Sequence, residues 1–347
     1  MRGANANSKL KILLRAPNWL GDIILVMPAV NALREALPDA KISVLVKESM
    51  ADFWRMTCVD NVISFSEKSS GIVGRRKLAG KLKKEKFDSV LIFPNSFDSA
   101  FVPWLAGIPE RVGWPSDGRG FLLNNKISKP DHLKDKRQFL SYVYLVEKWL
   151  GKEVDAKTEL SLKIPEEDRG AIKNELANFS APIIGLNPGA TYGSAKCWPA
   201  EYYAELSLKF HKEKNANIII VGGPGDTKTC EDIFNCIEKE YPGAKSWCKN
   251  LSGKTSICRL AAWLEQCSFL ITNDTGGMHV SAAVGTPVAA IFGPTDWSST
   301  APLGPNHKLI KTDADCAPCL KRECPTDHHC MTSIKPEKVW KEIKDML

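Results

Sequence analysis

The segment SFLITNDTGGMHVSAAVGTPVAAIFGPT, residues 268–295, predicts a buried strand, a Gly-Gly turn, a helix and a second buried strand. Alternation of strands and helices is typical of a parallel α/β sheet, because each helix returns the chain to the edge where the next parallel strand begins. This segment therefore indicates an α/β fold.

The same alternation extends from this segment toward the N-terminus. IIGLNPG (183–189) and NIIIVGGPGD (217–226) are each an apolar strand followed by a glycine-containing turn. In the first half, Lys11–Arg15 predicts a strand and residues 23–37 predict a helix, after which the strands ISVLVK and DSVLIFP follow. Both halves of the chain are therefore expected to contain a parallel sheet.

A polar, helix-like stretch near residues 165–182 separates the two halves. We therefore expect two Rossmann-like domains that face a central cleft, spanning residues 1–170 and 171–333. In open parallel sheets ligands bind at the carboxyl ends of the strands, so the loops after the predicted strands are where chemistry is expected.

The composition is that of a globular protein: 44% of the 347 residues are hydrophobic and 25% are charged, which excludes a disordered or collagen-like chain. No apolar run approaches the roughly 18 residues that a membrane span needs, and the first residues lack the apolar core of a signal peptide. We therefore expect a cytoplasmic protein in which most of the 11 cysteines are thiols.

Positive charge is concentrated in the first half. Residues 1–180 contain 29 basic and 22 acidic residues, whereas residues 181–347 contain 18 of each. This asymmetry predicts an anionic partner: nucleic acid, an anionic lipid surface or a phosphorylated substrate. The basic run Gly74–Lys86 has no interleaved aromatic residue, and the chain has no nucleic-acid-binding signature. The run fits a solvated helix face or a contact with anionic lipid headgroups equally well.

The most specific motif is Asn273–His279, between a strand and a helix. Its two glycines let the backbone approach a ligand closely, and the free N–H groups at the helix start favour a phosphate. Thr275 adds a hydroxyl donor, but Asp274 and Thr275 are also ordinary N-capping residues. Phosphate binding and simple capping both remain open, and His279 fits a structural or a ligand-binding role.

Two further loops follow predicted strands in the second half. The loop Asn187–Pro199 contains Lys196, whose charge could neutralise a leaving phosphate without a metal, or which is merely exposed beside a buried tryptophan. The turn Gly222–Asp226 ends in an acid that could hold a ribose hydroxyl, which is a weak signal by itself.

The loop Arg15–Asp22 has the corresponding position after the first strand. Asp22 precedes an apolar helix, so it fits either an N-cap or a general base within reach of a substrate hydroxyl. The loop lacks the G-x-G-x-x-G fingerprint, which disfavours a nicotinamide or flavin enzyme.

Four cysteines lie close together near the C-terminus: Cys316, Cys319, Cys324 and Cys330. They could bind zinc or an iron–sulfur cluster, although the C-x5-C spacing of the last pair differs from that of compact zinc knuckles. The alternative is a packed loop of reduced thiols.

Four segments together resemble glycosyltransferase family 9, the ADP-heptose:lipopolysaccharide heptosyltransferases. They are RAPNWLGDIILVMPAV, NPGATYGSAKCWP, NDTGGMHVSAAVGTPVAAIFGPT and CAPCLKRECPTDHHCM. The resemblance extends from about Lys9 to the end of the chain and is nearest to the type II members. It implies a GT-B fold with an N-terminal acceptor domain and a C-terminal nucleotide-sugar domain. It also implies that the last helix, residues 334–347, crosses back to the first domain.

The resemblance further implies an inverting transfer of L-glycero-D-manno-heptose from ADP-heptose that needs neither a metal nor another cofactor. For type II members the acceptor is the first heptose of heptosyl-Kdo2-lipid A, in the lipopolysaccharide inner core of Gram-negative bacteria. The implied partners are therefore ADP-heptose and a lipid A-linked acceptor, with peripheral contact between the basic first half and the cytoplasmic face of the anionic inner membrane. Nucleic acid is not an expected partner. The alternatives are transfer to Kdo2-lipid A itself, a sugar-nucleotide epimerase on the same fold, and a non-catalytic binding protein.

The resemblance assigns roles by position. Asp22 matches the family's proposed general base, and Lys196 matches the lysine on the donor phosphates. The expected acceptor-binding residues are Asp22 and its neighbours Asn18, Trp19 and Gly21. The expected donor-binding residues are Asn187, Gly189, Thr191, Lys196, Gly222, Gly223, Asp226, Asp274, Thr275, Gly276, Gly277, Met278 and His279. The four late cysteines recur in family members without implying a metal, so no metal site is expected.

Overall fold

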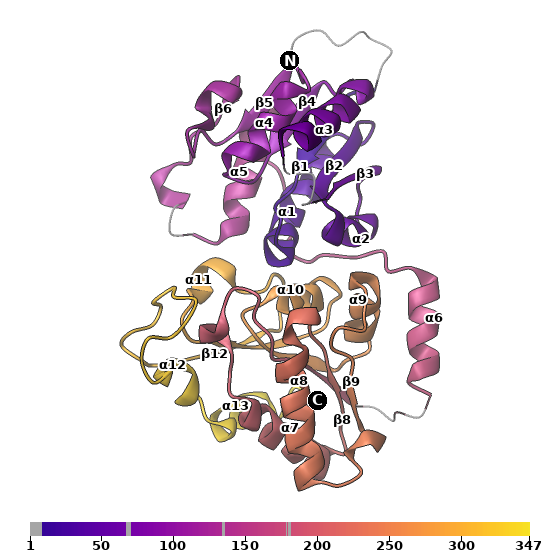
Figure 1. Ribbon diagram of the computed structural model, residues 1–347, viewed down its shortest axis with the longest axis vertical. Helices are drawn as coiled ribbons and strands as arrows, with labels where there is room; N and C mark the ends of the chain where they lie inside the picture. Colours follow the sequence, from indigo (N-terminus) through magenta and orange to yellow (C-terminus); the bar gives the residue numbers. More distant parts are fainter. Residues whose placement is uncertain (1–8, 67–70, 134–135, 178, 180–181) are drawn as a thin grey trace. The chain divides into compact units, whose positions relative to one another are not determined.

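The computed structural model describes residues 9–66, 71–133, 136–177, 179 and 182–347, which belong to two compact units, Met1–Thr158 and Glu159–Leu347 (Figure 1). Each unit is built around its own parallel sheet, as the alternation of strands and helices predicted. Two Rossmann-like α/β units of this kind are the components of a GT-B fold.

The described residues of the first unit form a six-stranded parallel sheet. Its strands are β1 (Lys11–Arg15), β2 (Lys41–Lys47), β3 (Asn61–Phe65), β4 (Ser89–Ile92), β5 (Glu110–Gly113) and β6 (Asn125–Lys126). Their order is β3-β2-β1-β4-β5-β6, and the register places Leu13 of β1 beside Ser43 of β2 and Val90 of β4. The direction of the strand order reverses at β1 and β4, which is where ligands bind in sheets of this kind.

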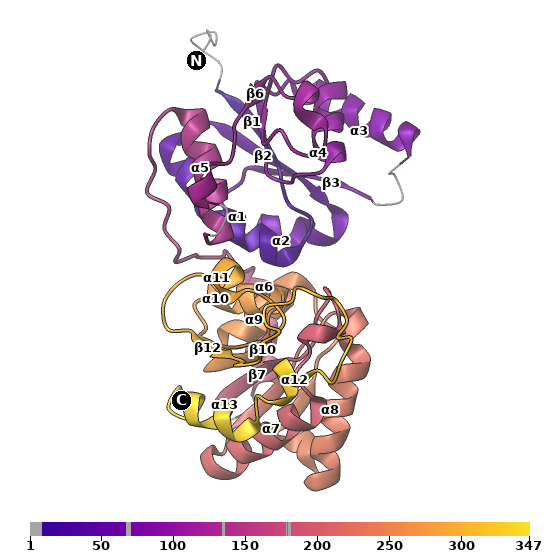
Figure 2. The same cartoon turned by 90° about the vertical axis from the view of Figure 1, so that its left-hand side faces the viewer.

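Helices cover both faces of this sheet. They are α1 (Leu20–Ala36), α2 (Ala51–Arg55), α3 (Ile72–Glu85), α4 (Phe97–Leu105) and α5 (Gln138–Leu150). α1 packs against α5, α3 packs against α4, and Figure 2 shows these two pairs on opposite sides of the sheet. Because the central strands are covered on both faces, their side chains are apolar in succession and not alternating.

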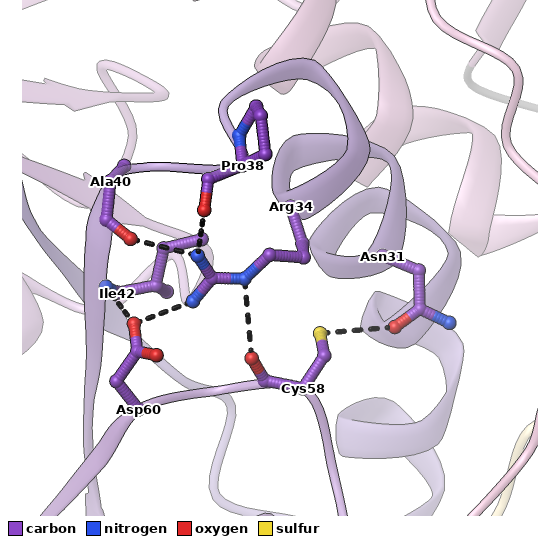
Figure 3. A network of polar contacts seen from close by, with 7 residues as sticks. All are labelled: Asn31, Arg34, Pro38, Ala40, Ile42, Cys58 and Asp60. Carbon is purple, nitrogen blue, oxygen red and sulfur yellow. Dashed lines mark hydrogen bonds and ion pairs between the residues drawn. The ribbon is translucent and has the colours of Figure 1, made fainter.

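A polar network fixes the edge of the first sheet opposite the loops after the strands (Figure 3). Arg34 near the end of α1 donates to four oxygen atoms. These belong to Pro38 at 3.2 Å, Ala40 at 2.7 Å, Cys58 at 3.3 Å and Asp60 at 2.5 Å. Asp60 also accepts the backbone N–H of Ile42 at 2.7 Å, so one side chain ties α1 to the segments that lead into β2 and β3.

The described residues of the second unit form another six-stranded parallel sheet, in the order β12-β11-β10-β7-β8-β9. Its strands are β7 (Ile183–Asn187), β8 (Asn217–Ile220), β9 (Cys248–Asn250), β10 (Phe269–Asn273), β11 (Val288–Phe292) and β12 (Lys308–Lys311). Its helices are α6 (Glu166–Glu175), α7 (Ala200–Lys214), α8 (Thr227–Glu240), α9 (Ile257–Glu265), α10 (Gly276–Ala283), α11 (Trp297–Thr300), α12 (His329–Thr332) and α13 (Pro336–Ile343).

The boundary between the units lies earlier than residue 170, where the sequence placed it. The whole of α6 belongs to the second unit, because it packs against α9. Ile172 is fully buried there, and Arg169 donates to both carboxylate oxygens of Glu265, at 2.9 and 2.7 Å. The polar connector predicted between the domains is therefore a surface helix of the second one.

The last helix packs within the second unit. Residues 334–347 were predicted to cross back to the first domain, which stays a prediction, and α13 packs against α7 and β12 of its own unit. Its buried residues Val339, Trp340 and Ile343 are part of the second unit's core. Trp340 lies 4.6 Å from Phe210 of α7, measured between ring centroids.

None of the helices in the described ranges combines the length and the apolarity that crossing a membrane requires.

Candidate functional site

The loop after β1 positions the residues predicted for the acceptor side. Asn18 and Trp19 lie between β1 and α1, and Gly21 and Asp22 are the second and third residues of α1. Trp19 occupies the N-cap position, so Asp22 is not the N-cap that its place in the sequence also allowed. Trp19 is 58% exposed, which makes its ring available to a ligand of this loop.

Helix α5 holds the carboxylate of Asp22. Gln138 Nε2 donates to Asp22 Oδ1 at 3.0 Å and to the Tyr142 hydroxyl at 2.7 Å. Burial, together with the nearby Asp22 carboxylate, raises the pKa of Tyr142, so this hydroxyl stays protonated. Gln138 therefore orients the carboxylate. Gln138 was not predicted from the sequence, because it lies 116 positions from Asp22 and is part of no recognisable motif.

The residues predicted for the donor side lie on loops that follow three neighbouring strands. β8, β7 and β10 are adjacent in the second sheet and run parallel, so the loops after them emerge at the same edge. These loops begin after Ile220, Asn187 and Asn273 respectively. The structure thus brings together three motifs that are far apart in the sequence.

Two glycines show how closely these loops approach one another. A Cβ on Gly189 would lie 2.1 Å from the carboxyl carbon of Asp226, and a Cβ on Gly277 would lie 1.8 Å from Nδ2 of Asn187. Asp226 also accepts the backbone N–H of Gly223 at 2.9 Å, which closes the Gly-rich turn. A larger residue at either glycine would push one loop away from the other.

The buried side chain of Asn273 joins these loops at the end of β10. Its Oδ1 accepts the backbone N–H of Trp198 at 3.1 Å and the Tyr203 hydroxyl at 3.0 Å. Its Nδ2 donates to the Pro188 carbonyl at 2.5 Å. Asn273 therefore anchors both ends of the long loop that contains Lys196. Asn273 was part of a predicted motif, but no pattern in the sequence indicated this bracing role.

Lys196 and Asp274 form a largely buried ion pair. Lys196 Nζ lies 2.7 Å from Asp274 Oδ2 and 3.2 Å from the Asp274 carbonyl oxygen, and the two side chains are 13% and 6% exposed. An ammonium group has three N–H donors, so one donor remains after these two contacts, and the ammonium also lies 4.8 Å from the centroid of the Tyr192 ring. Asp274 therefore orients Lys196, and its carboxylate is directed at the lysine.

Helix α10 begins where the predicted phosphate motif lies. Thr275 occupies the N-cap position without a side-chain capping bond, and Gly276 and Gly277 are the first two helical residues. Their N–H groups have no partner within the helix, and the helix dipole adds partial positive charge. Met278 packs in the core with Val288, so its predicted donor contact is restricted to its backbone. His279 is 3% exposed.

The cysteine-containing segment after β12 braces the loop of Lys196. The Ala195 N–H donates to the Arg322 carbonyl at 3.0 Å, and His328 Nε2 lies 2.7 Å from the Ala195 carbonyl oxygen. The Tyr192 hydroxyl donates to the Leu320 carbonyl at 2.8 Å. Thr191 of the same loop is exposed. The segment therefore fixes the part of the loop that directly precedes Lys196.

The four cysteines of that segment are free thiols in different surroundings. Cys316 is exposed, whereas Cys330 is buried and burial raises its pKa to about 11. Hydrogen bonds with Thr326 lower the pKa of Cys324. Within the described ranges, no group of three or more His, Cys, Asp or Glu side chains is arranged to hold a metal ion.

The chain is similar to known proteins over nearly its whole length. The family model described as "Glycosyltransferase family 9 (heptosyltransferase)" matches residues 75–329. The chain is 32% identical over 344 residues to "Lipooligosaccharide heptosyltransferase 2" of Campylobacter jejuni, with 97% of this chain and 98% of the relative covered. It is 29% identical over 360 residues to "Lipopolysaccharide heptosyltransferase 2" of Escherichia coli K12, with 97% and 99% covered.

A solved structure agrees with these relatives. The chain superimposes on the structure of the Escherichia coli ADP-heptose lipopolysaccharide heptosyltransferase II with a TM-score of 0.81 at 27% identity. The match covers 97% of this chain and 98% of that one.

Proposed function

Because this chain belongs to glycosyltransferase family 9, the heptosyltransferases, we propose that it transfers L-glycero-D-manno-heptose from ADP-heptose to the first heptose of heptosyl-Kdo2-lipid A. The observation that carries this proposal is the similarity, over 97% of the chain, to relatives named heptosyltransferase 2. The product would be the lipopolysaccharide inner core extended by one heptose.

The proposed reaction is a single displacement that inverts the anomeric centre. A hydroxyl oxygen of the acceptor heptose attacks the anomeric carbon of the donor, and its proton passes to the carboxylate of Asp22. The bond between the anomeric carbon and the β-phosphate oxygen breaks, and ADP leaves. The hydrogen bond from Gln138 supports this role, because it holds the carboxylate in one orientation before the substrate arrives.

The leaving diphosphate needs positive charge, which two features of the second unit supply. Lys196 is held by Asp274 with one N–H donor remaining, and the first N–H groups of α10 belong to Gly276 and Gly277. Charged donors held in place before the reaction stabilise a developing oxyanion strongly, because they need no reorganisation. The remaining contacts to the nucleotide and sugar would come from the other predicted donor-side residues, which are Asn187, Gly189, Thr191, Gly222, Gly223 and Asp226. This set of donors supports a reaction that does not require a metal.

The test of the proposed function is ADP release from ADP-heptose, with and without heptosyl-Kdo2-lipid A. We expect release only with acceptor, and an acceptor mass increased by one heptose. Release with Kdo2-lipid A alone would identify the earlier inner-core step, and conversion of the donor without any acceptor would identify an epimerase. No reaction under any of these conditions would contradict the proposal.

We also propose that the first unit contacts the cytoplasmic face of an anionic membrane through the exposed side of α3 and α4. On α4, the rings of Phe97, Phe101 and Trp104 stack in succession with centroids 5.8 Å apart, and Phe97 and Trp104 are 39% and 43% exposed. Phe121, 71% exposed, adds a ring 6.1 Å from Phe97. Exposed aromatic rings of this kind fit the boundary between lipid headgroups and acyl chains.

Basic residues accompany these rings, because α3 packs against α4. Arg76, Lys83 and Lys84 are exposed on α3, and each basic residue near anionic headgroups contributes about 1 kcal/mol to membrane binding. Sedimentation with anionic and neutral vesicles tests the contact. We expect binding to anionic vesicles only, weakened by salt and by the double substitution Trp104→Ser and Phe121→Ser. Equal sedimentation of both proteins with anionic vesicles would contradict it.

A further inference from the structure

A cavity of about 240 Å³ in the first unit has no part in the chemistry described above. It lies between α3 and α4 at the ends of the central strands, and its lining includes Arg15 from β1 and Phe65 from β3. This is the edge of the sheet at which ligands of parallel sheets bind. Drug-sized ligands occupy about 300–1,000 Å³, so the cavity suits a small group and not a whole nucleotide sugar.

The charged side chains of the cavity are mostly basic. Among the described lining residues, Arg15, Arg75, Lys77 and Lys81 are cations and Asp98 is the acid. Asp98 is already paired, because its Oδ1 lies 2.5 Å from Arg75 Nε. Lys77 and Lys81 have no ion-pair partner within the described part of the chain. The cavity is therefore positively charged and its lysines can accommodate an anion.

Arg15 is a buried cation that lines this cavity. It is 6% exposed, and its guanidinium lies 5.0 Å from the centroid of Phe65. Its guanidinium donates to neutral groups, the Ala16 carbonyl and Asn18 Oδ1, the latter at 3.1 Å. Burial lowers the pKa of Arg15 to about 10, so the group remains charged at neutral pH while its charge is poorly solvated. An anion in the cavity would offset that cost.

We propose that this cavity binds a phosphate monoester of the lipid-linked acceptor. This inference rests on the proposed function, since that function supplies a lipid A acceptor bearing phosphates. A guanidinium and two ammonium groups around a small space match the charge and the several oxygens of a phosphate dianion. The bond from Arg15 to Asn18 joins the cavity to the loop that leads into Asp22, so a phosphate held here would lie on the acceptor side.

The first experiment measures binding of inorganic phosphate to the full-length chain by calorimetry at constant ionic strength, with ADP present at saturating concentration so that phosphate cannot bind at Lys196 and the start of α10. The test variant is Lys77→Ala with Lys81→Ala. The matched control is Lys126→Ala with Lys129→Ala, which removes the same charge from exposed positions of the same unit that do not line the cavity. All four lysines are exposed, so both variants should melt at the wild-type temperature.

We expect the wild type and the control to bind phosphate alike and the test variant to bind at least about tenfold more weakly, since a charged hydrogen bond contributes that much or more. Equal binding by all three proteins, or equally effective competition by chloride, would mean an adventitious ion only and would overturn the inference. This measurement requires no transfer reaction, so it stands even if the proposed function fails.

The second experiment identifies the source of the phosphate. Transfer is measured with an intact acceptor and with one whose lipid A phosphates have been removed enzymatically. We expect the test variant to have a KM about tenfold higher for the intact acceptor, with kcat and the KM for the dephosphorylated acceptor unchanged. An equal change with both acceptors, or no change with either, would overturn the assignment to the acceptor. No transfer by the wild type would contradict the proposed function instead.

Discussion

Asp22 is the residue on which the proposed chemistry depends most. Asp22→Asn preserves the shape of the side chain and the oxygen that accepts from Gln138, but it removes the proton acceptor. We expect kcat to fall by about 10²–10⁴-fold, the usual contribution of a general base. ADP binding should be unchanged, because the predicted nucleotide contacts belong to the second unit. Transfer at a near wild-type rate would remove Asp22 from the mechanism.

Gln138→Leu is the matched control for that experiment. It leaves the carboxylate in place and removes its orienting hydrogen bond, together with the bond from Gln138 to the Tyr142 hydroxyl. Because only the first of these bonds holds Asp22, kcat should fall by about tenfold, the equivalent of one net hydrogen bond. A loss as large as that of Asp22→Asn would indicate that α5 itself is disturbed, and circular dichroism of the variant would reveal this.

Lys196 permits a second prediction at the scale of the residue. Lys196→Met removes the charge beside the leaving diphosphate and should lower kcat/KM by about 10²–10³-fold, as expected for loss of one preorganised donor. The substitution also leaves Asp274 buried without its partner, which by itself repels the diphosphate. Asp274→Asn combined with Lys196→Met should therefore be less impaired than Lys196→Met alone. Unchanged kcat/KM in Lys196→Met would contradict the assigned role.

At the scale of the element, the position of α10 depends on Gly277. Gly277→Ala places a methyl group 1.8 Å from Asn187 Nδ2, so either the Asn187 side chain or the first turn of α10 must move. We expect ADP to bind at least about tenfold more weakly, because both are predicted donor contacts and moving either one alters the predicted phosphate site. Calorimetric titration with ADP measures this loss.

A second substitution distinguishes steric displacement from general damage. The Cβ of Asn187 would lie 3.8 Å from the new methyl group, which is ordinary van der Waals contact. The double variant Asn187→Ala, Gly277→Ala should therefore bind ADP no more weakly than Asn187→Ala alone, since residues in contact are not additive. If the losses of ADP affinity in the two single variants simply add in the double variant, the clash with Asn187 is not the cause of the weaker binding by Gly277→Ala.

The elements with long apolar runs were predictable from the sequence, and the short edge elements were not. β1, β2, β7, β8, β10 and β11 are buried on both faces and have continuous apolar sequences, so each was expected. β3 is only half-buried and β6 has two residues, so neither has a clear pattern. The loops after the central strands were predictable for a similar reason, because the parallel sheet itself fixes where they emerge.

The supporting contacts of the site were less predictable. Gln138 holds Asp22 through one hydrogen bond, and Asn273 holds the loop of Lys196 through bonds at both of its ends, but both residues act on partners that are far away in the sequence. Neither contact produces periodicity or a motif in the sequence. A sequence can indicate which loops face a ligand, whereas the side chains that fix those loops depend on packing that no local pattern records.

At the scale of the whole molecule, the last helix is another element whose packing partner could not be predicted from the sequence. The pattern of α13 indicates that one face is buried, but not which unit covers it. Val339, Trp340 and Ile343 all lie in the core cluster that contains Phe210 and Phe269 of the second unit. The helix therefore completes the core of the unit to which the donor-side loops belong, and its loss should destabilise that unit.

Trp340→Ala tests this assignment. Truncating a buried aromatic side chain creates a cavity and costs about 3–5 kcal/mol. Because Trp340 packs against Phe210 and lies beneath Lys209, that cost should fall on the second unit. Hydrogen exchange measured by mass spectrometry should therefore show faster exchange in peptides from β7, β8 and β10, while peptides from β1, β2 and β4 exchange as in the wild type. Trp297→Ala, a partly exposed tryptophan of the same unit, is the matched control and should leave both sets unchanged. Faster exchange in the first unit would mean that α13 also stabilises that unit, as the family resemblance implied.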